Sequence, residues 1–507
     1  MPIKLNIQCA LVLLACLLGA CTREPPPQGF LVRNAVIVDG SGSPAYAADL
    51  RVREERILAI GRLDPLPGED VIDANGMVLA PGFIDSHSHV DGDILDHPDA
   101  LAAVSQGITT IVAGQDGGSP FPLADFYAQL DMNPAAVNVA SYAGHNTVRA
   151  QVMGDDFRRH ADREEVNAMQ QLLQQELASG AIGFSSGLEY DPGIYSDRSE
   201  VLQLAQVAAD AGTRYISHVR SEDRWFGDAV EEIIDIGRST GMPVQISHIK
   251  LAMKSLWGTA PEVLARLDAA RREGINISAD IYPYEYWQSN LMVLLPERDF
   301  TDREAVAYAL DQIAPPDGLC MTQFDPHPEY VGMTLSDIAA TREVDAVTAF
   351  MQLAAESTAM EEATGKSVDA IIGTSMIEDD IRQLLRWPET NVCTDGGLID
   401  LHPRSHGAFT RVLGRYVREE QLLGLEEAVH KMSGLTAKHL GFADRGVIRA
   451  GAYADLVLFD PATVTDNATP QAPDRLSDGI IAVWVAGVRV YENNAVTGAR
   501  PGKIIRP

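Results

Sequence analysis

The segment PGFIDSHSHVDGD, Pro81 to Asp93, carries two histidines one residue apart at the end of an apolar run. Residues i and i+2 of a β-strand point to the same side of a sheet, so His87 and His89 are expected to share one face. Two imidazoles on one face can bind a single metal ion such as zinc. The segment therefore predicts a strand whose end forms part of a metal site.

The residues after this segment alternate between short apolar runs and amphipathic helical stretches. Two helical stretches, 163–180 and 260–274, end in glycine, which commonly stops a helix. Eight strands that alternate with helices are typical of a (β/α)8 TIM-type barrel, an α/β fold. The expected strands are 82–89, 109–114, 137–144, 182–186, 214–219, 243–249, 276–282 and 391–395.

The sequence indicates two further parts of the structure besides the barrel. The stretch between the seventh and eighth strands is too long for one connection, so we expect an insertion at about residues 285–370. Short strand-like pieces occupy residues 30–80 and 440–507, on both sides of the barrel. We therefore expect a barrel over residues 81–439 and a small β-sandwich domain built from both terminal regions.

The first 29 residues indicate an export signal followed by a tether. Residues 1–20 contain one lysine and then a short apolar run, as a signal peptide does. This run ends in a segment, Leu18 to Cys21, that resembles a bacterial lipobox, and residues 21–29 form a Pro-rich tether. We expect a lipid on Cys21 and attachment to the periplasmic face of a bacterial cell envelope. Thr22, directly after the cysteine, favours the outer membrane over the inner membrane. The alternative to a lipid anchor is an ordinary secretory signal in which Cys21 occurs by chance.

Composition and charge narrow the range of partners. The chain of 507 residues has 46% hydrophobic and 22% charged residues, which is ordinary for a folded protein. Its formal net charge of −31 argues against nucleic acid or an anionic membrane surface as a partner. Membrane contact is expected only through Cys21. Beyond it, Cys320 and Cys393 are too few for a disulfide framework.

Polar residues that can bind a metal recur at the ends of the expected strands. The carboxyl ends of barrel strands form the face on which active sites are built. An isolated histidine at such a place is commonly a hydrogen-bonded structural residue, but here several fall at matching positions of a repeating unit. We therefore predict a metal centre with one position open for water. The polar residues at these strand ends are His87, His89, Asp116, His145, His218, His248 and Asp395, and all of them except His145 are predicted metal ligands.

Asp395, in the segment NVCTDGG, has the chemistry of a proton carrier. A carboxylate next to both a metal and its water can take a proton from the water and pass it to a leaving group. The alternative is a turn aspartate that precedes Gly396 and Gly397. We predict that Asp395 is the catalytic residue.

Taken together, these segments resemble the metal-dependent amidohydrolase superfamily, and more narrowly the N-acyl-D-amino-acid deacylases, or D-aminoacylases. The resemblance runs from about residue 30 to the end of the chain. The first-strand motif marks only the superfamily, whereas the whole set is more specific. The matching segments are PGFIDSHSHVD, QGITTIVAGQDGGS, GHNTVRAQVMG, GAIGFSSGLEYDPG, YISHVRSED, QISHIK, SADIYPY, CTDGG and HPRSHGAFTRVLGRYVRE.

The resemblance implies a zinc-dependent hydrolase that cleaves the amide between an acyl group and a D-amino acid. It implies one or two zinc ions, with His218 and His248 at the tightly bound ion. The residues implied at the other, often weakly filled, position are His87, His89 and Asp395.

One residue departs from the family pattern. The family commonly has a cysteine after the second strand, where this chain has Asp116. A carboxylate can bind zinc or bridge two ions, but it is a harder ligand than a thiolate. We expect Asp116 to be a ligand; the alternative is that it only orients a histidine. The departure also weakens the assignment of the substrate.

An amino-acid product carries an α-carboxylate, so the site needs cations. In the resembling enzymes, residues at the positions of Lys250, Arg404 and one tyrosine of the YPY segment, Tyr282 or Tyr284, bind this carboxylate. Arg404 is the stronger candidate because a guanidinium pairs with a carboxylate through two hydrogen bonds. The alternative for each cation is a surface ion pair.

Three further residues are expected around the metal. Arg220 and Glu222 follow His218 closely and are expected to orient the ligands. His145 is expected to contact either the metal-side oxygen or the substrate.

Two other classes of function remain open from the sequence. One is a different amidohydrolase, either a dipeptidase that acts on D- or L-residues or a cyclic-amide hydrolase. The related cyclic-amide enzymes usually carry a carboxylated lysine after the fourth strand, and SSGLEYDPG has no lysine there. The other is a lipid-anchored protein that binds a ligand without turnover.

Overall fold

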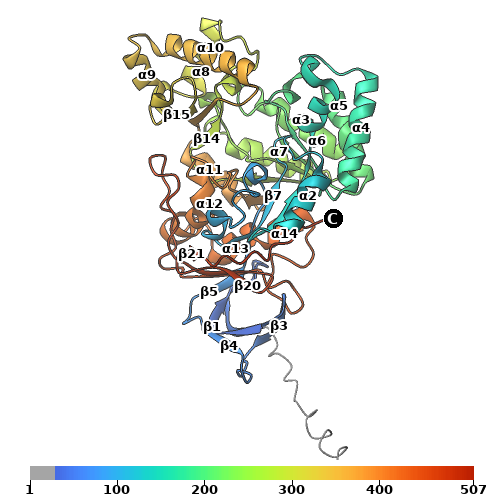
Figure 1. The fold of residues 1–507 in the computed structure, drawn as a ribbon, viewed down its shortest axis with the longest axis vertical. Helices are drawn as coiled ribbons and strands as arrows, with labels where there is room; N and C mark the ends of the chain where they lie inside the picture. Colours follow the sequence, from blue (N-terminus) through green and yellow to red (C-terminus); the bar gives the residue numbers. More distant parts are fainter. Residues whose placement is uncertain (1–28) are drawn as a thin grey trace, which may run out of the picture.

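The computed structural model describes residues 29–507, so the expected signal peptide, Cys21 and nearly all of the tether lie outside the described residues. In the view of Figure 1, a barrel occupies the middle, a β-rich region lies below it, and a smaller lobe lies above it. None of the helices within residues 29–507 is long and apolar enough to cross a bilayer.

Eight parallel strand positions form the barrel, in the orders β6-β7-β8 and β17-β13-β12-β11-β10-β9. Only Tyr142 separates β8 from β9, so these two count as one position. Between β6 and β17, Asp395 N donates to His87 O at 2.9 Å, which closes the ring. The predicted barrel is confirmed. Its strands are β6 (Phe83–Asp85), β7 (Ile108–Ala113), β8 (Asn138–Ser141), β9 (Ala143–Gly144), β10 (Phe184–Gly187), β11 (Tyr215–His218), β12 (Val244–Ile246), β13 (Ile277–Ile281) and β17 (Thr390–Val392).

The helices of the barrel have the ends that their sequences predict. Asp162 caps α4 in a reciprocal capping box with Glu165, and Gly180 and Gly274 follow α4 and α7 with positive φ angles. The helices are α1 (Leu101–Val104), α2 (Leu123–Met132), α3 (His145–Met153), α4 (Arg163–Ala178), α5 (Arg198–Asp210), α6 (Phe226–Thr240), α7 (Ala260–Arg272), α11 (Glu378–Arg386), α12 (Arg404–Arg411), α13 (Leu425–Met432) and α14 (Gly434–Leu440).

The two terminal regions meet in one nine-stranded sheet, in which β18 pairs with β5. Its order is β21-β20-β19-β18-β5-β1-β2-β3, with β4 beside β1. The strands are β1 (Gly29–Ile37), β2 (Tyr46–Arg53), β3 (Arg56–Gly61), β4 (Asp70–Asp73), β5 (Val78–Pro81), β18 (Leu456–Phe459), β19 (Ile480–Val485), β20 (Val488–Glu492) and β21 (Ala495–Val496).

Alternating side chains of β18 attach this sheet to the barrel. Leu456 and Leu458 pack in a core of the sheet's own, whereas Val457 and Phe459 belong to the large core of the barrel. Successive side chains of a strand point to opposite faces, so one apolar strand serves both cores. The β-region therefore covers the amino-terminal side of the barrel and leaves the carboxyl ends of the strands free.

The lobe at the top of Figure 1 lies between β13 and α11 in the chain, where the insertion is expected. Its antiparallel sheet has the order β14-β16-β15. We call this segment, residues 286–374, the insertion lobe. Its elements are β14 (Tyr286–Ser289), α8 (Arg303–Gln312), β15 (Leu319–Phe324), α9 (Leu335–Thr341), α10 (Ala346–Thr364) and β16 (Asp369–Thr374).

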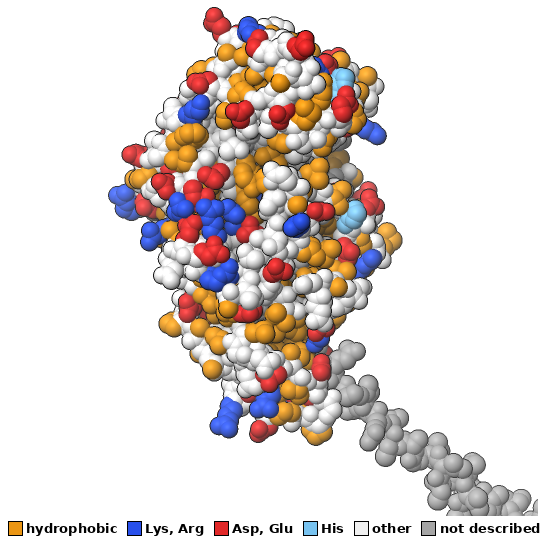
Figure 2. Space-filling view, turned by 90° about the vertical axis from the view of Figure 1, so that its left-hand side faces the viewer, with side chains coloured by type: hydrophobic (Ala, Val, Ile, Leu, Met, Phe, Trp, Pro, Cys, Tyr) orange, Lys and Arg blue, Asp and Glu red, His pale blue; other side chains and the backbone are white. Residues whose placement is uncertain are grey.

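The face of the molecule shown in Figure 2 carries acidic, basic and apolar side chains mixed together. No single sign of charge covers that face. The features that indicate function lie inside the barrel mouth.

Candidate metal-binding active site

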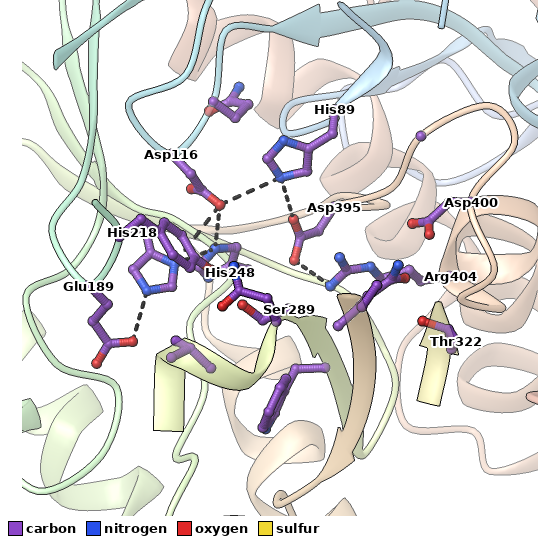
Figure 3. A pocket seen from close by; sticks show the side chains of 18 of the residues that line it. His89, Asp116, Glu189, His218, His248, Ser289, Thr322, Asp395, Asp400 and Arg404 are labelled. Atoms are coloured by element: carbon purple, nitrogen blue, oxygen red, sulfur yellow. Dashed lines mark hydrogen bonds and ion pairs between the residues drawn. The ribbon is translucent and has the colours of Figure 1, made fainter. Parts of the chain in front are cut away.

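Six predicted ligand residues converge at the carboxyl ends of the barrel strands, and Figure 3 labels all of them except His87. Each lies at or shortly after the end of its strand, so the barrel geometry brings together residues that are far apart in the chain. His89 is partly exposed, and the other five are buried. The six are His87, His89, Asp116, His218, His248 and Asp395.

Asp116 lies at the centre of this cluster. Its Oδ2 is 3.1 Å from His248 Nε2, 3.5 Å from His89 Nε2 and 3.9 Å from His218 Nδ1. Its Oδ1 is 3.4 Å from His87 Nε2. One carboxylate therefore faces all four imidazoles, so Asp116 is within reach of an ion held by either pair of histidines.

Asp395 connects the cluster to a cation. Its Oδ1 lies 3.1 Å from His89 Nε2 and 3.3 Å from His87 Nε2, and its Oδ2 accepts a hydrogen bond from Arg404 Nη1 at 2.5 Å. Burial disfavours the ionised carboxyl, but Arg404 and the nearby histidines hold the pKa of Asp395 well below its usual range. Asp395 is therefore anionic in this arrangement.

The backbone is strained at three of these residues. Asp116, His248 and Asp395 have φ angles of 51°, 32° and 53°, in the left-handed region that side chains other than glycine rarely adopt. Such strain costs on the order of 1–3 kcal/mol per residue and occurs preferentially at functional sites. The loop of Asp116 also needs a glycine beside it, because a Cβ on Gly187 would lie 2.0 Å from Asp116 O.

The donor atoms fit a metal ion. His87 Nε2 and Asp116 Oδ1 are buried and have no hydrogen-bond partner among residues 29–507. The donor atoms of His87, Asp116, His248 and Asp395 all lie within 4.8 Å of one another. Buried polar atoms are nearly always satisfied, so this group lacks a partner that binds imidazole nitrogen and carboxylate oxygen. A divalent cation of the zinc type supplies that partner.

Glu222 and Lys250 support the far side of His248. Glu222 Oε1 is 3.0 Å from His248 Nδ1, and Lys250 Nζ donates to both Glu222 oxygens at 2.6 and 2.7 Å. Glu222 therefore contacts His248, one of the predicted metal-binding residues that it is expected to orient. The ammonium of Lys250 lines the cavity, but Glu222 already neutralises it.

The structure separates the two candidate tyrosines. Tyr282 lines the cavity next to Arg404, and the guanidinium carbon of Arg404 lies 4.8 Å from the centre of the Tyr282 ring. The buried hydroxyl of Tyr282 has no hydrogen-bond partner among the described residues. Burial raises the pKa of Tyr282 well above its ordinary value, so the hydroxyl stays protonated and can donate. Tyr284 lies outside the cavity lining, under Arg411.

Two predicted residues lie away from the cluster, and both expectations are wrong. His145 is the first residue of α3, where its Nε2 is 2.8 Å from Glu200 Oε1, and it does not line the cavity. Arg220 donates to Glu232 on α6 and to Ser196 O, and it contacts none of the metal-cluster histidines. In both cases a buried acid of a neighbouring helix attracts the side chain to the helical layer.

Two acids at the site were missed by sequence reasoning. Glu189 Oε2 lies 3.0 Å from His218 Nε2, and Asp280 Oδ1 accepts a hydrogen bond from His248 N at 2.5 Å. Glu189 follows β10, so its place after a strand end was a usable signal. Asp280 lies within the buried strand β13, where the position of an acid gives no such signal.

The cluster forms the floor of a cavity of about 680 Å³. Barrel-strand ends and the loop after β17 supply the floor and one wall, and the insertion lobe supplies the opposite wall (Figure 3). Such a volume suits a small-molecule ligand. The wall residues of the insertion lobe include Trp287, Gln288, Ser289, Asn290, Val293, Leu294, Ile313, Thr322, Gln323, Ser367, Asp369 and Ala370.

Comparison with known proteins identifies the family. Residues 70–491 match the model of the Amidohydrolase family. The chain is 38% identical to an N-acyl-D-glutamate deacylase of Alcaligenes xylosoxydans xylosoxydans, over 94% of this chain and 96% of the relative. It is 36% identical to the D-aminoacylase of the same organism, over 95% of this chain and 98% of the relative.

Solved structures give the same result. An N-acyl-D-glutamate deacylase from Bordetella bronchiseptica, complexed with zinc and a phosphonate inhibitor, superimposes with a TM-score of 0.84 at 38% identity and covers 94% of this chain and 99% of its own. A dihydropyrimidinase from Brevibacillus agri, at 17% identity and a TM-score of 0.54, covers 94% of this chain and 98% of its own and shares only the fold.

The barrel, the ligand cluster at its carboxyl face and these full-length matches agree with the resemblance noted in the sequence. The chain belongs to the amidohydrolase family, within the group of the D-aminoacylases and N-acyl-D-amino-acid deacylases.

Proposed function

We propose that this protein is a zinc-dependent hydrolase that cleaves the amide of N-acyl-D-amino acids to a carboxylate and a free D-amino acid. One observation carries the proposal. A single cavity combines a buried cluster of unsatisfied imidazole and carboxylate donors with a guanidinium that contacts the acid of that cluster. Relatives that match along the whole chain act on N-acyl-D-amino acids.

The chain offers ligands for one or two ions. His218 and His248 would hold one, His87, His89 and Asp395 the other, and Asp116 faces both groups. When bound, zinc would act as a Lewis acid that polarises the acyl carbonyl and lowers the pKa of a water molecule.

We assign the proton transfer to Asp395, whose Oδ1 faces the histidines and whose Oδ2 accepts from Arg404. When the substrate carboxylate replaces Oδ2 on Arg404 Nη1, Oδ2 becomes free to take the proton that the attacking water loses as it bonds to the acyl carbon. The same oxygen then gives the proton to the departing amine, as general acid–base catalysis requires.

We assign Arg404 and Tyr282 to the binding of the substrate's α-carboxylate. Arg404 Nε and the Tyr282 hydroxyl are buried without partners among the described residues, and both side chains line the cavity. Buried donors without partners are costly, so a carboxylate that accepts from both is favoured. Lys250, next to Tyr282, adds positive charge, although Glu222 holds its ammonium.

The test uses the purified protein without its first 21 residues, loaded with zinc. Amine release is measured on matched N-acetyl-D- and N-acetyl-L-amino acids, with the metal content of the same sample. The proposal requires release from the D series and little from the L series. Release only from dipeptides would instead make the enzyme a dipeptidase, and binding without turnover would make it a ligand-binding protein.

We also propose that a lipid on Cys21 anchors the enzyme at the periplasmic face of the outer membrane. The support is the sequence that ends in Cys21, followed by the Pro-rich tether. Expression of the full chain in a Gram-negative host with labelled palmitate tests it. Label on the wild type and none on Cys21→Ser is expected, with the wild type in the outer-membrane fraction. Unlabelled protein in the soluble periplasmic fraction would contradict the anchor.

A further inference from the structure

We propose that this enzyme discriminates against N-acyl-D-glutamate and N-acyl-D-aspartate in favour of N-acyl-D-amino acids of the same shape with uncharged side chains. The inference rests on the proposed function and specifies its substrate. Similarity alone does not decide the question, because identity is 38% to an N-acyl-D-glutamate deacylase, and 36% both to an N-acyl-D-aspartate deacylase and to a D-aminoacylase.

The first observation is the supply of cations. Among the described residues, Lys250 and Arg404 are the only lysine and arginine that line the cavity. Glu222 holds the ammonium of Lys250, and Arg404 is placed to bind the α-carboxylate. A substrate with an acidic side chain carries a second carboxylate, which would then find no free cation in the cavity.

Nearby arginines do not fill this gap. Arg298 donates to Asp191 and to the backbone oxygens of Met292 and Glu189, and Arg224 pairs with Asp223 and donates to Leu294 O. Neither lines the cavity. Their hydrogen bonds fix the loops around the cavity.

The second observation is the wall supplied by the insertion lobe. It presents neutral polar groups such as Gln288, Ser289 and Thr322 beside apolar ones such as Trp287 and Val293. Ser289 and Thr322 are labelled in Figure 3. Thr322 lies at an irregularity in β15, because Met321 pairs with Ile371 and Gln323 with the adjacent Ala370. A bulged residue is re-aimed relative to its strand, and the buried Thr322 hydroxyl has no partner among residues 29–507.

The acids of the cavity wall also oppose a second carboxylate on the substrate. Asp369 accepts from Ser357 and from Leu291 N, and Asp93 accepts from Leu398 N. Asp223 is paired with Arg224, and Asp400 accepts from Ser405. Of these four acids only Asp223 is paired with a cation among residues 29–507, so an acidic side chain would bring further negative charge beside the others. An uncharged side chain adds no such charge and can hydrogen-bond with the neutral groups of the wall.

The experiment compares substrates of equal shape. The zinc-loaded enzyme is assayed for kcat/KM on N-acetyl-D-glutamine against N-acetyl-D-glutamate, and on the asparagine and aspartate pair. We expect the amide member of each pair to be hydrolysed roughly 10- to 100-fold more efficiently, the range of one charged hydrogen bond. Equal efficiencies, or a preference for the acidic members, would overturn the inference.

A pair of variants locates the selectivity. Thr322→Lys adds a cation to the wall, and Thr322→Met is its uncharged control of similar length. The ratio of glutamate to glutamine turnover should rise about tenfold in the lysine variant relative to the methionine variant. Equal ratios would overturn the role of this wall. Absence of hydrolysis of every N-acyl-D-amino acid by the wild type would instead defeat the proposed function, so the two failures are distinguishable.

Discussion

The two ends of the barrel differ in whether their buried polar atoms have hydrogen-bond partners. At the carboxyl ends of the strands, His87, Asp116 and Tyr282 carry buried polar atoms without partners among the described residues. At the amino-terminal end, Asp455 pairs with Arg445 and also accepts from Ala486 N at 2.7 Å and Asn138 Nδ2 at 3.2 Å. The satisfied end stabilises the protein, whereas the unsatisfied end has capacity left for a metal and a substrate.

The largest expected effect is on activity at the unsatisfied end. Asp395→Asn keeps the shape of the side chain but removes the proton acceptor, so kcat should fall about 100- to 10,000-fold. The ion assigned to His218 and His248 does not depend on Asp395, so it should be retained, and the melting temperature should stay close to that of the wild type. Kinetics, metal analysis and thermal unfolding on one preparation decide this. Substantial turnover in the variant would remove Asp395 from the mechanism.

The next effect is on stability at the satisfied end. Asp455→Asn leaves the buried Arg445 without its counter-ion, so the free energy of unfolding should fall by about 3 kcal/mol. Arg449→Gln breaks the exposed pair with Asp444 and is the control, with an expected change below about 1 kcal/mol. Denaturant unfolding measures both. If Asp455→Asn instead lowered kcat of the folded enzyme, the division between the two ends would be wrong.

A smaller effect on activity is expected from two arginines that each lie over a tyrosine. Arg404 lies over Tyr282 in the cavity, and Arg411 lies over Tyr284 outside the cavity lining. Arg404→Lys loses the planar contact to the substrate carboxylate and should lower kcat/KM about 10- to 100-fold. Arg411→Lys should change it less than about threefold. Similar losses in both variants would show that neither arginine binds substrate specifically.

The smallest effect is a pH dependence of stability at the satisfied end. Burial of Lys431, whose Nζ donates to Trp387 O at 2.5 Å, lowers its pKa from 10.5 to about 8. Between these values the unfolded chain binds a proton that the folded chain lacks, so stability rises with pH, by at most about 1.4 kcal/mol per unit. Below pH 8 the lysine is charged in both states and adds no slope.

Lys431→Met removes this titration. Urea unfolding at pH 8 and pH 9 should therefore show a larger gain in stability for the wild type than for the variant. The comparison between the two proteins cancels the other groups that titrate in this range. Equal gains in both proteins would contradict the lowered pKa of Lys431.

The sequence predicts the fold and the cluster better than it predicts the surroundings of the cluster. The spacing of strands is a local signal, and residues at strand ends must meet because the barrel closes, so His87, His218 and Asp395 could be placed in advance. The insertion was expected from chain length alone. The same reasoning cannot find Asp280, which lies inside a strand and reaches the site only through the packing of β13 against β12.

His145 and Arg220 are residues that the position after a strand end selects wrongly. Both follow strand ends as true ligands do, yet each turns toward a buried glutamate, Glu200 or Glu232, of the helical layer. Each glutamate lies on a later helix of the outer layer, and the residues around His145 or Arg220 do not show that its side chain will turn toward that helix. The choice between Tyr282 and Tyr284 likewise depends on which ring faces the barrel mouth, and strand alternation continues poorly through Pro283.

The most direct test of the central claim is a crystal structure of the zinc-loaded enzyme, with anomalous scattering measured at the zinc edge. We expect zinc within bonding distance of Asp116 and of the histidine pair His218 and His248, or the pair His87 and His89, with Arg404 facing the open side. Zinc bound elsewhere, with His87 Nε2 and Asp116 Oδ1 still without a partner, would contradict it.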